Sequence, residues 1–257
     1  MRLMFLNQSP YNGDEARHTR TETLLRSYAS TTTELDLCYP EDYPGAHVFR
    51  KMGGQSVLNG LHHTLEAPQL VSKTVWAAEN GYDAVVQSNT FDPGVDAARL
   101  AVGIPVVGVF RTALHVAATL ATRFAIMVPL DSHVPYTWRL VKSYGMEPWI
   151  TSIRPIQVYG PDLASRKDEI EGLAVDVMRK QVTESGAELI IPLGGALIPY
   201  VVSPEVLAEK VGVPVFNTKS VGIRFAETCV DLGMTQSPAA YPRADLSFAD
   251  FGSYATS

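Results

Sequence analysis

Two adjacent histidines and a glutamate have a spacing that can hold a metal ion. His62 and His63 stand in the stretch NGLHHTLEAP, and Glu66 follows four residues after His62. Residues four apart share one face of a helix, so an imidazole and a carboxylate could converge on one ion there. Asp131 and His133 could supply further ligands. Because no second half of a recognised metal motif follows at a fixed spacing, a hydrogen-bonding or solvated helix face is the competing interpretation.

A second type of candidate is a group that transfers a proton or binds a carboxylate. His115 lies one turn into an apolar helical pattern, and an imidazole is the side chain most often used for proton transfer. The alternative for His115 is a hydrogen-bonded core residue. Arg111 follows an apolar stretch, and its guanidinium could bind a substrate carboxylate through two hydrogen bonds. The alternative for Arg111 is a surface ion pair.

Small and polar residues directly follow several apolar stretches. Small residues let backbone N–H groups approach a ligand oxygen, so one set predicts an anion or oxyanion site, with a tight turn as the alternative. The hydroxyl and amide groups of the other set could bind a carboxylate or a cyclic amide, or cap the helices that follow. The first set is Gly194, Gly195 and Ala196; the second is Ser88, Asn89, Thr90, Asn217 and Thr218, and Thr112 also fits a capping role.

These residues need a framework of short buried strands that alternate with helices. Continuous runs rich in Val and Ile predict strands that are buried on both faces of a parallel sheet. Amphipathic stretches between them, such as 166–186, predict helices, and the alternation predicts an α/β fold. Sites in open α/β sheets lie beyond the carboxyl ends of the strands, where the candidate residues stand. Strands are expected at 3–6, 84–86, 104–110, 124–129, 188–193 and 213–217.

Two stretches of the chain repeat similar phrases in the same order. GYDAVVQSNTFDPG, from Gly81, is similar to GAELIIPLGGALIP, from Gly186; VGIPVVG and VGVPVFN then follow in turn. This repetition predicts two similar lobes, each a mostly parallel sheet flanked by helices, related by a pseudo-two-fold axis and with a ligand-binding cleft between them. The plainer interpretation is that VGxPV is a common helix-to-strand turn. We expect lobe 1 to comprise about 1–110 and 220–240, lobe 2 about 111–219, and a C-terminal tail 241–257.

Composition and charge exclude several classes of protein. The chain has 257 residues, of which 46% are hydrophobic, and a formal net charge of −6. This negative charge argues against duplex nucleic acid as a partner, because its binding needs a basic surface. No apolar run approaches the roughly 18–20 residues of a membrane span, and the opening residues lack an export signal. The two cysteines are too few for a disulfide framework. No GxGxxG or GxSxG motif occurs. The sequence therefore predicts a cytoplasmic protein without a nucleic-acid partner, a membrane partner or a nucleotide cofactor.

Several of these phrases are shared with a known family. The opening LNQS is similar to that family's Ile-Asn-Pro-Asn, with Asn7 retained, and DPGVDAAR at 92–99 is similar to its Asp-Pro-Gly-Leu-x-Ala-Ala-Arg. ALHVAA, with His115, resembles its helix entry, and GVPVFNTKSVGIRFAE at 212–227 resembles its closing unit. In order and spacing the chain resembles the aspartate/glutamate/hydantoin racemase superfamily, within it the hydantoin and allantoin racemases. The resemblance covers most of the chain and implies the two-lobed fold and a homo-oligomer.

The resemblance also implies a mechanism from which this chain departs. Racemases of this group use two cysteines, one from each lobe; one thiolate removes the α-proton and the opposite thiol returns a proton. Here the first position falls at Asn89, or at Thr90 with a slip of one residue. The second falls at Gly195, or at Gly194 by the internal repeat. Asn and Thr side chains have no useful proton affinity near neutral pH, so we expect proton transfer without thiols.

One main functional hypothesis and two alternatives follow. The main hypothesis is an isomerase or lyase that acts on a small carboxylate or hydantoin-like cyclic amide through an enolate-like or oxyanion intermediate, without a cofactor. The alternatives are a metal-assisted hydrolase or lyase that uses the metal-ligand candidates named above, and a non-catalytic small-molecule binding protein. We expect His115, Thr90 and Asn89 to serve catalysis. Substrate binding is expected from Asn7, Gln8, Ser9, Ser88, Arg111, Thr112, Gly194, Gly195, Ala196, Asn217 and Thr218.

Overall fold

The computed structural model describes most of the chain and divides it into two compact units. Described are all residues except 43–45, 47–50, 52–59, 161–162, 195 and 255–257. Unit 1 comprises Met1–Val48, His62–Val109 and Gly222–Ser257, and unit 2 comprises Phe49–Leu61 and Phe110–Val221. Within the described ranges, no helix is both long enough and apolar enough to cross a membrane.

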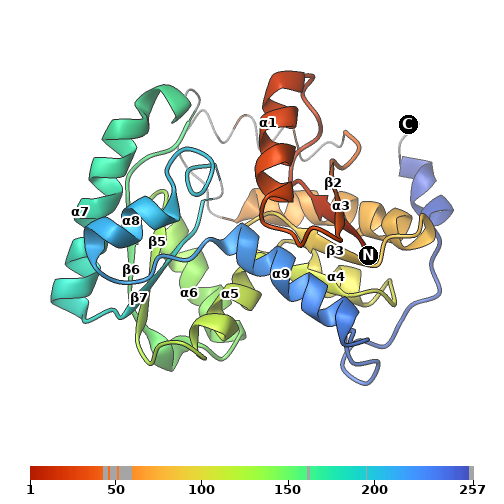
Figure 1. Ribbon diagram of the computed structural model, residues 1–257. Helices are drawn as coiled ribbons and strands as arrows, with labels where there is room; N and C mark the ends of the chain where they lie inside the picture. The colour runs from red at the N-terminus through yellow and green to blue at the C-terminus, as the bar shows by residue number, and fades with distance from the viewer. Residues whose placement is uncertain (43–45, 47–50, 52–59, 161–162, 195, 255–257) are drawn as a thin grey trace. The chain divides into compact units, whose positions relative to one another are not determined.

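Unit 1 is built on a parallel four-stranded sheet with the order β2-β1-β3-β4 (Figure 1). The two central strands are apolar almost throughout and have buried side chains on both faces, as expected for a sheet covered on both sides. The edge strand β2 instead alternates buried leucines with half-exposed or exposed residues. The strands are β1 (Arg2–Leu6), β2 (Glu34–Cys38), β3 (Ala84–Gln87) and β4 (Val106–Gly108).

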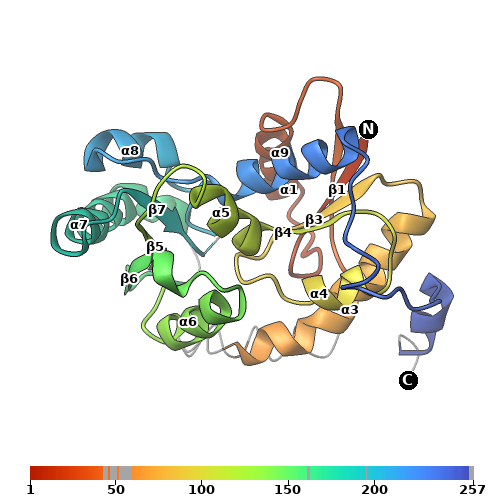
Figure 2. The same cartoon turned by 90° about the horizontal axis from the view of Figure 1, so that it is seen from below.

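Helices cover both faces of this sheet. Figure 2 shows α3 (Leu61–Glu79) and α4 (Val95–Arg99) on one side of the strands and α1 (Glu15–Arg26) and α9 (Thr218–Asp231) on the other. On the first side, Leu70 of α3 packs with Met4 and Val85. The close approach of α9 explains a helical glycine: a Cβ on Gly222 would lie 2.7 Å from Val109 Cγ1.

Unit 2 contains a second parallel sheet, with the order β6-β5-β7. Its strands are β5 (Phe124–Val128), β6 (Ile150–Pro155) and β7 (Leu189–Pro192). Val215 continues the sheet through a single parallel bridge to Ile190. The apolar stretch before Asn217 therefore ends at the same edge as β7.

The helices of unit 2 also lie on both faces of its sheet. Buried residues of α7 and α8 pack with Ala125, Met127 and Ile190 of the strands. The helices α5 and α6 lie on the other side (Figure 2). The bounds are α5 (Val109–Ala117), α6 (His133–Ser143), α7 (Lys167–Ser185) and α8 (Pro204–Val211), with short 3-10 helices η1 (Glu147–Trp149) and η2 (Leu163–Arg166).

The predicted fold class is confirmed: the chain is α/β, with two lobes that each contain a parallel sheet flanked by helices. Two expected strands differ in extent. The strand expected at 104–110 is only Val106–Gly108, because Val109 already begins α5 without a connecting loop. The stretch 213–217 makes one bridge rather than a strand.

The polar C-terminal segment folds onto unit 1. The N–H of Ala244 donates to the carbonyl of Leu100 at 2.7 Å. A 3-10 helix, η3 (Phe248–Tyr254), follows, and the N–H of Phe248 donates to Glu79 at 2.8 Å. The rings of Phe248 and Phe251 pack against the apolar cluster that α3, α4 and β4 form. This segment therefore has an anchoring surface within its own unit.

Candidate active site

In unit 1, the loops that follow β1 and β3 lie side by side at the carboxyl edge of the sheet. The backbone N–H of Ser88 donates to the carbonyl of Leu6 at 2.9 Å. On the other side of β1, the N–H of Asn7 donates to the carbonyl of Cys38 at 2.8 Å. Parallel strands end at the same edge, so the residues expected to form a site after β1 and β3 meet in this unit.

Asn89 is held through both ends of its side-chain amide. Its Nδ2 donates to Oε1 of Gln8 and, at 3.1 Å, to Oε1 of Glu66. Its Oδ1 accepts from the N–H of Phe91 at 2.9 Å, as in an Asx-turn. The backbone N–H of Asn89 donates to Oε1 of Gln87 at 2.9 Å. Both amide hydrogens have protein acceptors, so Asn89 fixes the loop that follows β3.

Behind Asn89, the first turns of α3 place a buried histidine against a buried carboxylate. Nδ1 of His63 lies 2.8 Å from Oε1 of Glu66, and the two side chains are 4% and 0% exposed. The ring of His63 lies 3.8 Å from that of His62 and 5.1 Å from that of Phe91, measured between centroids. Burial lowers the pKa of His63 from 6.5 to about 3, so the imidazole is neutral near pH 7.

The partners of His63 assign its tautomer. The carboxylate oxygen of Glu66 accepts hydrogen bonds, so the ring proton is assigned to Nδ1, and the lone pair remains on Nε2. A neutral imidazole oriented by a carboxylate can accept a proton, and the carboxylate then offsets part of the cost that burial places on the imidazolium. The pair lies next to Asn89, the position at which the sequence resemblance places the first catalytic group.

The loop after β3 ends in a constrained turn. Asp92 has a positive φ of 52°, and the N–H of Asp92 donates to the carbonyl of Asn89 at 3.1 Å. Its carboxyl group lies over Gly108, where a Cβ would approach Asp92 Cγ to 2.6 Å. Thr90, between them, is only 2% exposed. The loop after β3 and the end of β4 therefore pack closely against each other within unit 1.

In unit 2, a second group of expected site residues gathers at the carboxyl edge of its sheet. Gly194 follows β7 with φ +88°, and a Cβ there would lie 2.4 Å from Pro129 Cγ. Oδ1 of Asn217 accepts from the N–H groups of Lys219 and Ser220 at 3.2 and 3.1 Å, which caps α9. Thr218 and Lys219 are each 1% exposed. Ala196 is exposed, and Gly195 lies outside the described residues.

The three candidates on α5 have different surroundings. Arg111 places its guanidinium carbon 5.5 Å from the ring centre of Tyr144. Thr112 is buried. His115 is exposed, and its Nδ1 lies 2.8 Å from the carbonyl oxygen of Arg111 one turn earlier. Within its helix, His115 therefore has a local backbone partner. In the other lobe, Nδ2 of Asn7 donates to the carbonyl of Ser9 at 3.2 Å.

The metal-ligand candidates are distributed over both units. His62 and His63 belong to unit 1, whereas Asp131 and His133 belong to unit 2. Asp131 accepts a hydrogen bond from Gln157. In the part of the chain that the structure describes, no group of three or more His, Cys, Asp or Glu side chains is arranged to hold a metal ion.

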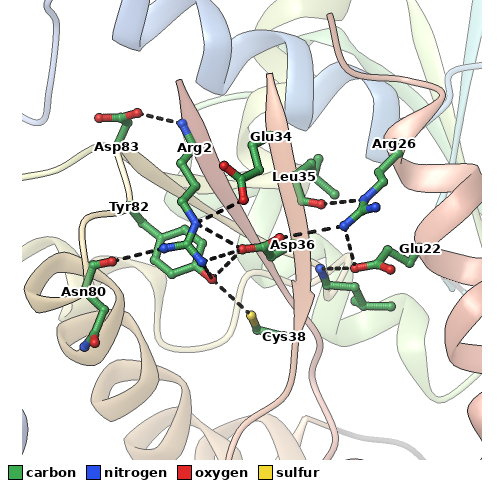
Figure 3. A network of polar contacts seen from close by, with 11 residues as sticks. Arg2, Glu22, Arg26, Glu34, Leu35, Asp36, Cys38, Asn80, Tyr82 and Asp83 are labelled. Atoms are coloured by element: carbon green, nitrogen blue, oxygen red, sulfur yellow. Dashed lines mark hydrogen bonds and ion pairs between the residues drawn. The ribbon is translucent and has the colours of Figure 1, made fainter. Parts of the chain in front are cut away.

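Both cysteines lie away from the positions that the resemblance assigns to catalytic thiols. Figure 3 shows Cys38 at the end of the edge strand, with its Sγ 3.8 Å from the hydroxyl of Tyr82. That hydroxyl donates to Asp36 at 2.7 Å, and Asp36 also accepts from Arg2 at 2.9 Å. Cys229 is buried in α9. Burial raises the pKa of both thiols, which favours the protonated form.

Comparison with known proteins agrees with this architecture. The Asp/Glu/hydantoin racemase family model matches residues 21–226, which is well over half of the chain. The chain belongs to this family.

Individual relatives support the same placement. The hydantoin racemase of Pseudomonas sp. (strain NS671) is 31% identical over 191 residues, covering 73% of this chain and 74% of the relative. The hydantoin racemase of Rhizobium meliloti is 31% identical over 193 residues, covering 73% and 78%. Among solved structures, allantoin racemase from Pseudomonas fluorescens matches with a TM-score of 0.81 at 22% identity, covering 96% of this chain and 98% of that chain. The structural likeness concerns the fold.

For this racemase family member, sequence reasoning identified the polar residues but not their connection. Sequence spacing paired His62 with Glu66, whereas the structure pairs His63 with Glu66 and places both against Asn89, which also donates to Gln8. The three-residue spacing of His63 and Glu66 was the available signal, since such residues also share a helix face. The contact with Asn89 spans 26 residues of sequence and carries no local pattern.

Proposed function

We propose that the protein is a cofactor-independent enzyme of isomerase type that moves the proton of a carbon acid in a small cyclic amide, such as a hydantoin, or in a related carboxylate. Membership of the racemase family and the names of the two hydantoin racemase relatives support the substrate class. The observation that carries the proposal is the buried His63–Glu66 pair beside Asn89. In this proposal, His63 takes the part that thiols play in the family.

The proposed reaction begins with transfer of the α-proton of the substrate to Nε2 of His63. The electron pair of the broken C–H bond delocalises into the adjacent carbonyl and gives an enolate-like anion. Burial disfavours the imidazolium, and Glu66, which accepts from Nδ1, offsets part of that cost. A water molecule donates a proton to the opposite face of the planar carbon, which gives the other enantiomer, and the hydroxide that forms takes the proton from Nε2 of His63. No atom is gained or lost, so the reaction needs no co-reactant.

The remaining expected residues keep supporting roles in this proposal. Thr90 and His115 are the other proton-transfer candidates, and Asn89 positions the loop on which Thr90 stands. In unit 1, polar groups at the carboxyl edge of the sheet would bind the carbonyl and N–H groups of the substrate; they are Asn7, Gln8, Ser9 and Ser88. The candidates of unit 2 remain predicted substrate-binding residues; they are Arg111, Thr112, Gly194, Gly195, Ala196, Asn217 and Thr218.

The test is a comparison of matched histidine variants in a chiral assay. Loss of optical activity of an enantiopure 5-substituted hydantoin, and exchange of its α-proton in D2O, are measured with chelator-treated wild-type protein. We expect H63Q to lower kcat/KM at least about 100-fold, the scale of general acid–base catalysis. H62Q is the control and is expected to stay within a few fold, whereas H115Q tests the alternative proton-transfer group. E66Q, which keeps the shape of the side chain, is expected to lower kcat.

Three other results would contradict the proposed role of His63 or the proposed reaction. A large loss in H115Q with an active H63Q would contradict the role of His63. Activity that disappears on chelation and returns with a stoichiometric metal would support the metal-assisted hydrolase or lyase. Tight binding without proton exchange across hydantoins and small carboxylates would indicate a binding protein. Far-ultraviolet circular dichroism of every variant shows whether it is folded.

A further inference from the structure

Gln87 is the last residue of β3, and half of its side-chain amide is unpaired. The residue is 3% exposed. Its Oε1 accepts from the backbone N–H of Asn89 at 2.9 Å. Its Nε2 is buried and has no hydrogen-bond partner among the residues that the structure describes. Neither the sequence prediction nor the proposed proton transfer gives Gln87 a role.

The bond to Asn89 fixes the direction in which the amide of Gln87 points. A backbone N–H needs an acceptor, so the oxygen and the nitrogen of this amide cannot be exchanged. A buried N–H group without an acceptor is costly, and nearly all such groups in proteins are paired. Gln181 in unit 2, which is also buried, donates Nε2 to the carbonyl of Ile126 at 2.8 Å. Nε2 of Gln87 therefore needs an acceptor, which a ligand oxygen can supply.

Gln87 lies on the same face of the sheet as the proposed base. Side chains alternate along a strand, so Gln87 shares the face of Val85, which packs with Leu70 of α3 (Figure 2). Glu66 precedes Leu70 by about 6 Å along the helix, and Gln87 follows Val85 by about 7 Å along the strand. Because α3 ends just before β3 begins, both steps lead to the carboxyl edge. The amide of Gln87 therefore lies level with Glu66.

Asn89 contacts both the amide of Gln87 and the imidazole of His63. Its backbone N–H donates to Gln87, and its Nδ2 lies 3.1 Å from Nδ1 of His63. The unpaired donor and the proposed base are thus neighbours of one residue. In a hydantoin the carbonyl carbon is bonded directly to the carbon that loses its proton. A small ring can therefore place its reacting carbon at His63 and its carbonyl oxygen at Gln87.

The charges around Gln87 favour a neutral carbonyl over a carboxylate. The amide nitrogen carries no charge, and Glu66 is a fully buried carboxylate. On the neighbouring strand, about 5 Å away, Gly108 pairs in register with Gln87 and lies under the carboxyl group of Asp92. A buried carboxylate ligand would be repelled by these groups and would gain no ion pair from an amide. A neutral carbonyl accepts the hydrogen bond without that cost.

We propose that Gln87 is a further catalytic residue, whose Nε2 donates to the carbonyl oxygen beside the reacting carbon of a neutral cyclic amide. The proposal rests on the proposed function for the identity of the reacting carbon. As the α-proton moves to His63, electron density shifts onto this oxygen, so the hydrogen bond from Gln87 is stronger in the transition state than in the bound substrate. Gln87 itself neither gains nor loses a proton.

Two substitutions separate donation by Nε2 from positioning of Asn89. Q87E keeps an oxygen that can accept from Asn89 and replaces the donor nitrogen by a second oxygen, whereas Q87M removes both groups. In the racemisation of 5-methylhydantoin at pH 8, we expect each variant to lower kcat at least about 100-fold, with KM within a few fold. Loss of one oxyanion donor has this scale. Wild-type kcat in Q87E, with the loss confined to Q87M, would make Gln87 a positioning residue and overturn the proposal.

A glutamine elsewhere in unit 1 supplies the matched control. Nε2 of Gln236 donates to the carbonyls of Val102 and Ile104 at 2.8 and 2.9 Å, near the start of β4. Q236M removes a paired amide and is expected to keep kcat within twofold. A fall in kcat in Q236M as large as in Q87M would show a general effect of glutamine loss and contradict the role of Gln87.

A measurement on wild-type protein does not depend on the folding of Q87E. The probe is 5,5-dimethylhydantoin, which keeps the carbonyl groups but has no α-proton. We expect the side-chain N–H signals of Gln87 in nuclear magnetic resonance, assigned by their absence from Q87M, to move downfield as the probe binds. Those of Gln181 should stay, because its Nε2 is already paired. Unchanged Gln87 signals at saturation would overturn the proposal.

Calorimetry with a matched anion tests the preference for a neutral ligand. N-carbamoyl-2-methylalanine is the ring-opened form of the same probe and carries a carboxylate. We expect it to bind wild type at least about tenfold more weakly than the ring, and equal or tighter binding would overturn the preference. Shifted Gln87 signals without racemisation of 5-methylhydantoin would overturn the proposed function and leave carbonyl binding by Gln87 standing. Racemisation with unshifted signals would overturn the role of Gln87 alone.

Discussion

At the scale of single residues, the unusual feature is a polar cluster that the core must accommodate. Glu66 is fully buried, and His63 and Asn89 are nearly so. Burial of a carboxylate is costly unless hydrogen bonds compensate, and here an imidazole and an amide both contact one of its oxygens. Apolar residues of similar size would avoid that cost. The cluster therefore fits a chemical or positioning role better than a purely stabilising one.

The lowered pKa of His63 makes stability depend on pH in a defined window. The folded chain keeps this ring neutral down to a pH of about 3, whereas the unfolded chain protonates it below about 6.5. Stability is therefore fully present above pH 6.5 and decreases as the pH falls towards 3. Between pH 7 and 5.5 we expect His63 to account for a loss of about 1 kcal/mol.

Urea unfolding of wild type, H63Q and H115Q at these two pH values measures the contribution of His63. H115Q should lose as much stability as wild type between pH 7 and 5.5, and H63Q should lose less. If H63Q and wild type lost the same free energy of unfolding between pH 7 and 5.5, the fold would not hold His63 neutral.

At the scale of elements, the sequence predicts the buried strands well and the edges poorly. β1, β3, β5 and β7 are short apolar runs with both faces covered, and all lie within a residue or two of their expected bounds. β6 was not predicted, because its exposed edge position allows polar residues between its apolar ones. The candidate site residues after the strands stay predictions, and the hydrogen bonds that join Asn89 to Gln8 and Glu66 link distant segments, so no local sequence pattern indicates them.

The close contact between Gly194 and Pro129 predicts a large effect of one added methyl group. In G194A, the new Cβ meets Pro129 Cγ at 2.4 Å and the residue must keep a φ of +88°. We expect a loss of about 2–4 kcal/mol in the free energy of unfolding, from backbone strain plus overpacking. Gly212 has φ +79°, and a Cβ there would have no atom within 4 Å, so G212A carries the strain alone and should lose about 1 kcal/mol. Equal losses in chemical denaturation would contradict the contact.

At the scale of the whole molecule, family membership and local chemistry give different information. The family model and the two parallel sheets establish what kind of protein this is. They do not specify the reacting group, because a fold hosts several chemistries and the site determines which one. Asn89 stands where the resemblance expects a thiol, and it is engaged by Gln8 and Glu66. The residue that replaces the thiol is thus hydrogen-bonded to its neighbours within unit 1.

This difference makes a prediction about every thiol in the chain. Cys38 and Cys229 are its only cysteines, both have a raised pKa, and Cys38 contacts Tyr82 at the sheet edge. We expect a C38A/C229A double variant to keep racemisation of a methyl-substituted hydantoin within about twofold, since the proposed proton transfer uses no thiolate, while its stability drops by about 1–2 kcal/mol from lost packing. Iodoacetamide at pH 8 should likewise leave wild-type activity intact. If the double variant lost activity while its circular dichroism spectrum stayed native, catalysis would require a thiol. His63 alone would then not be sufficient for proton transfer.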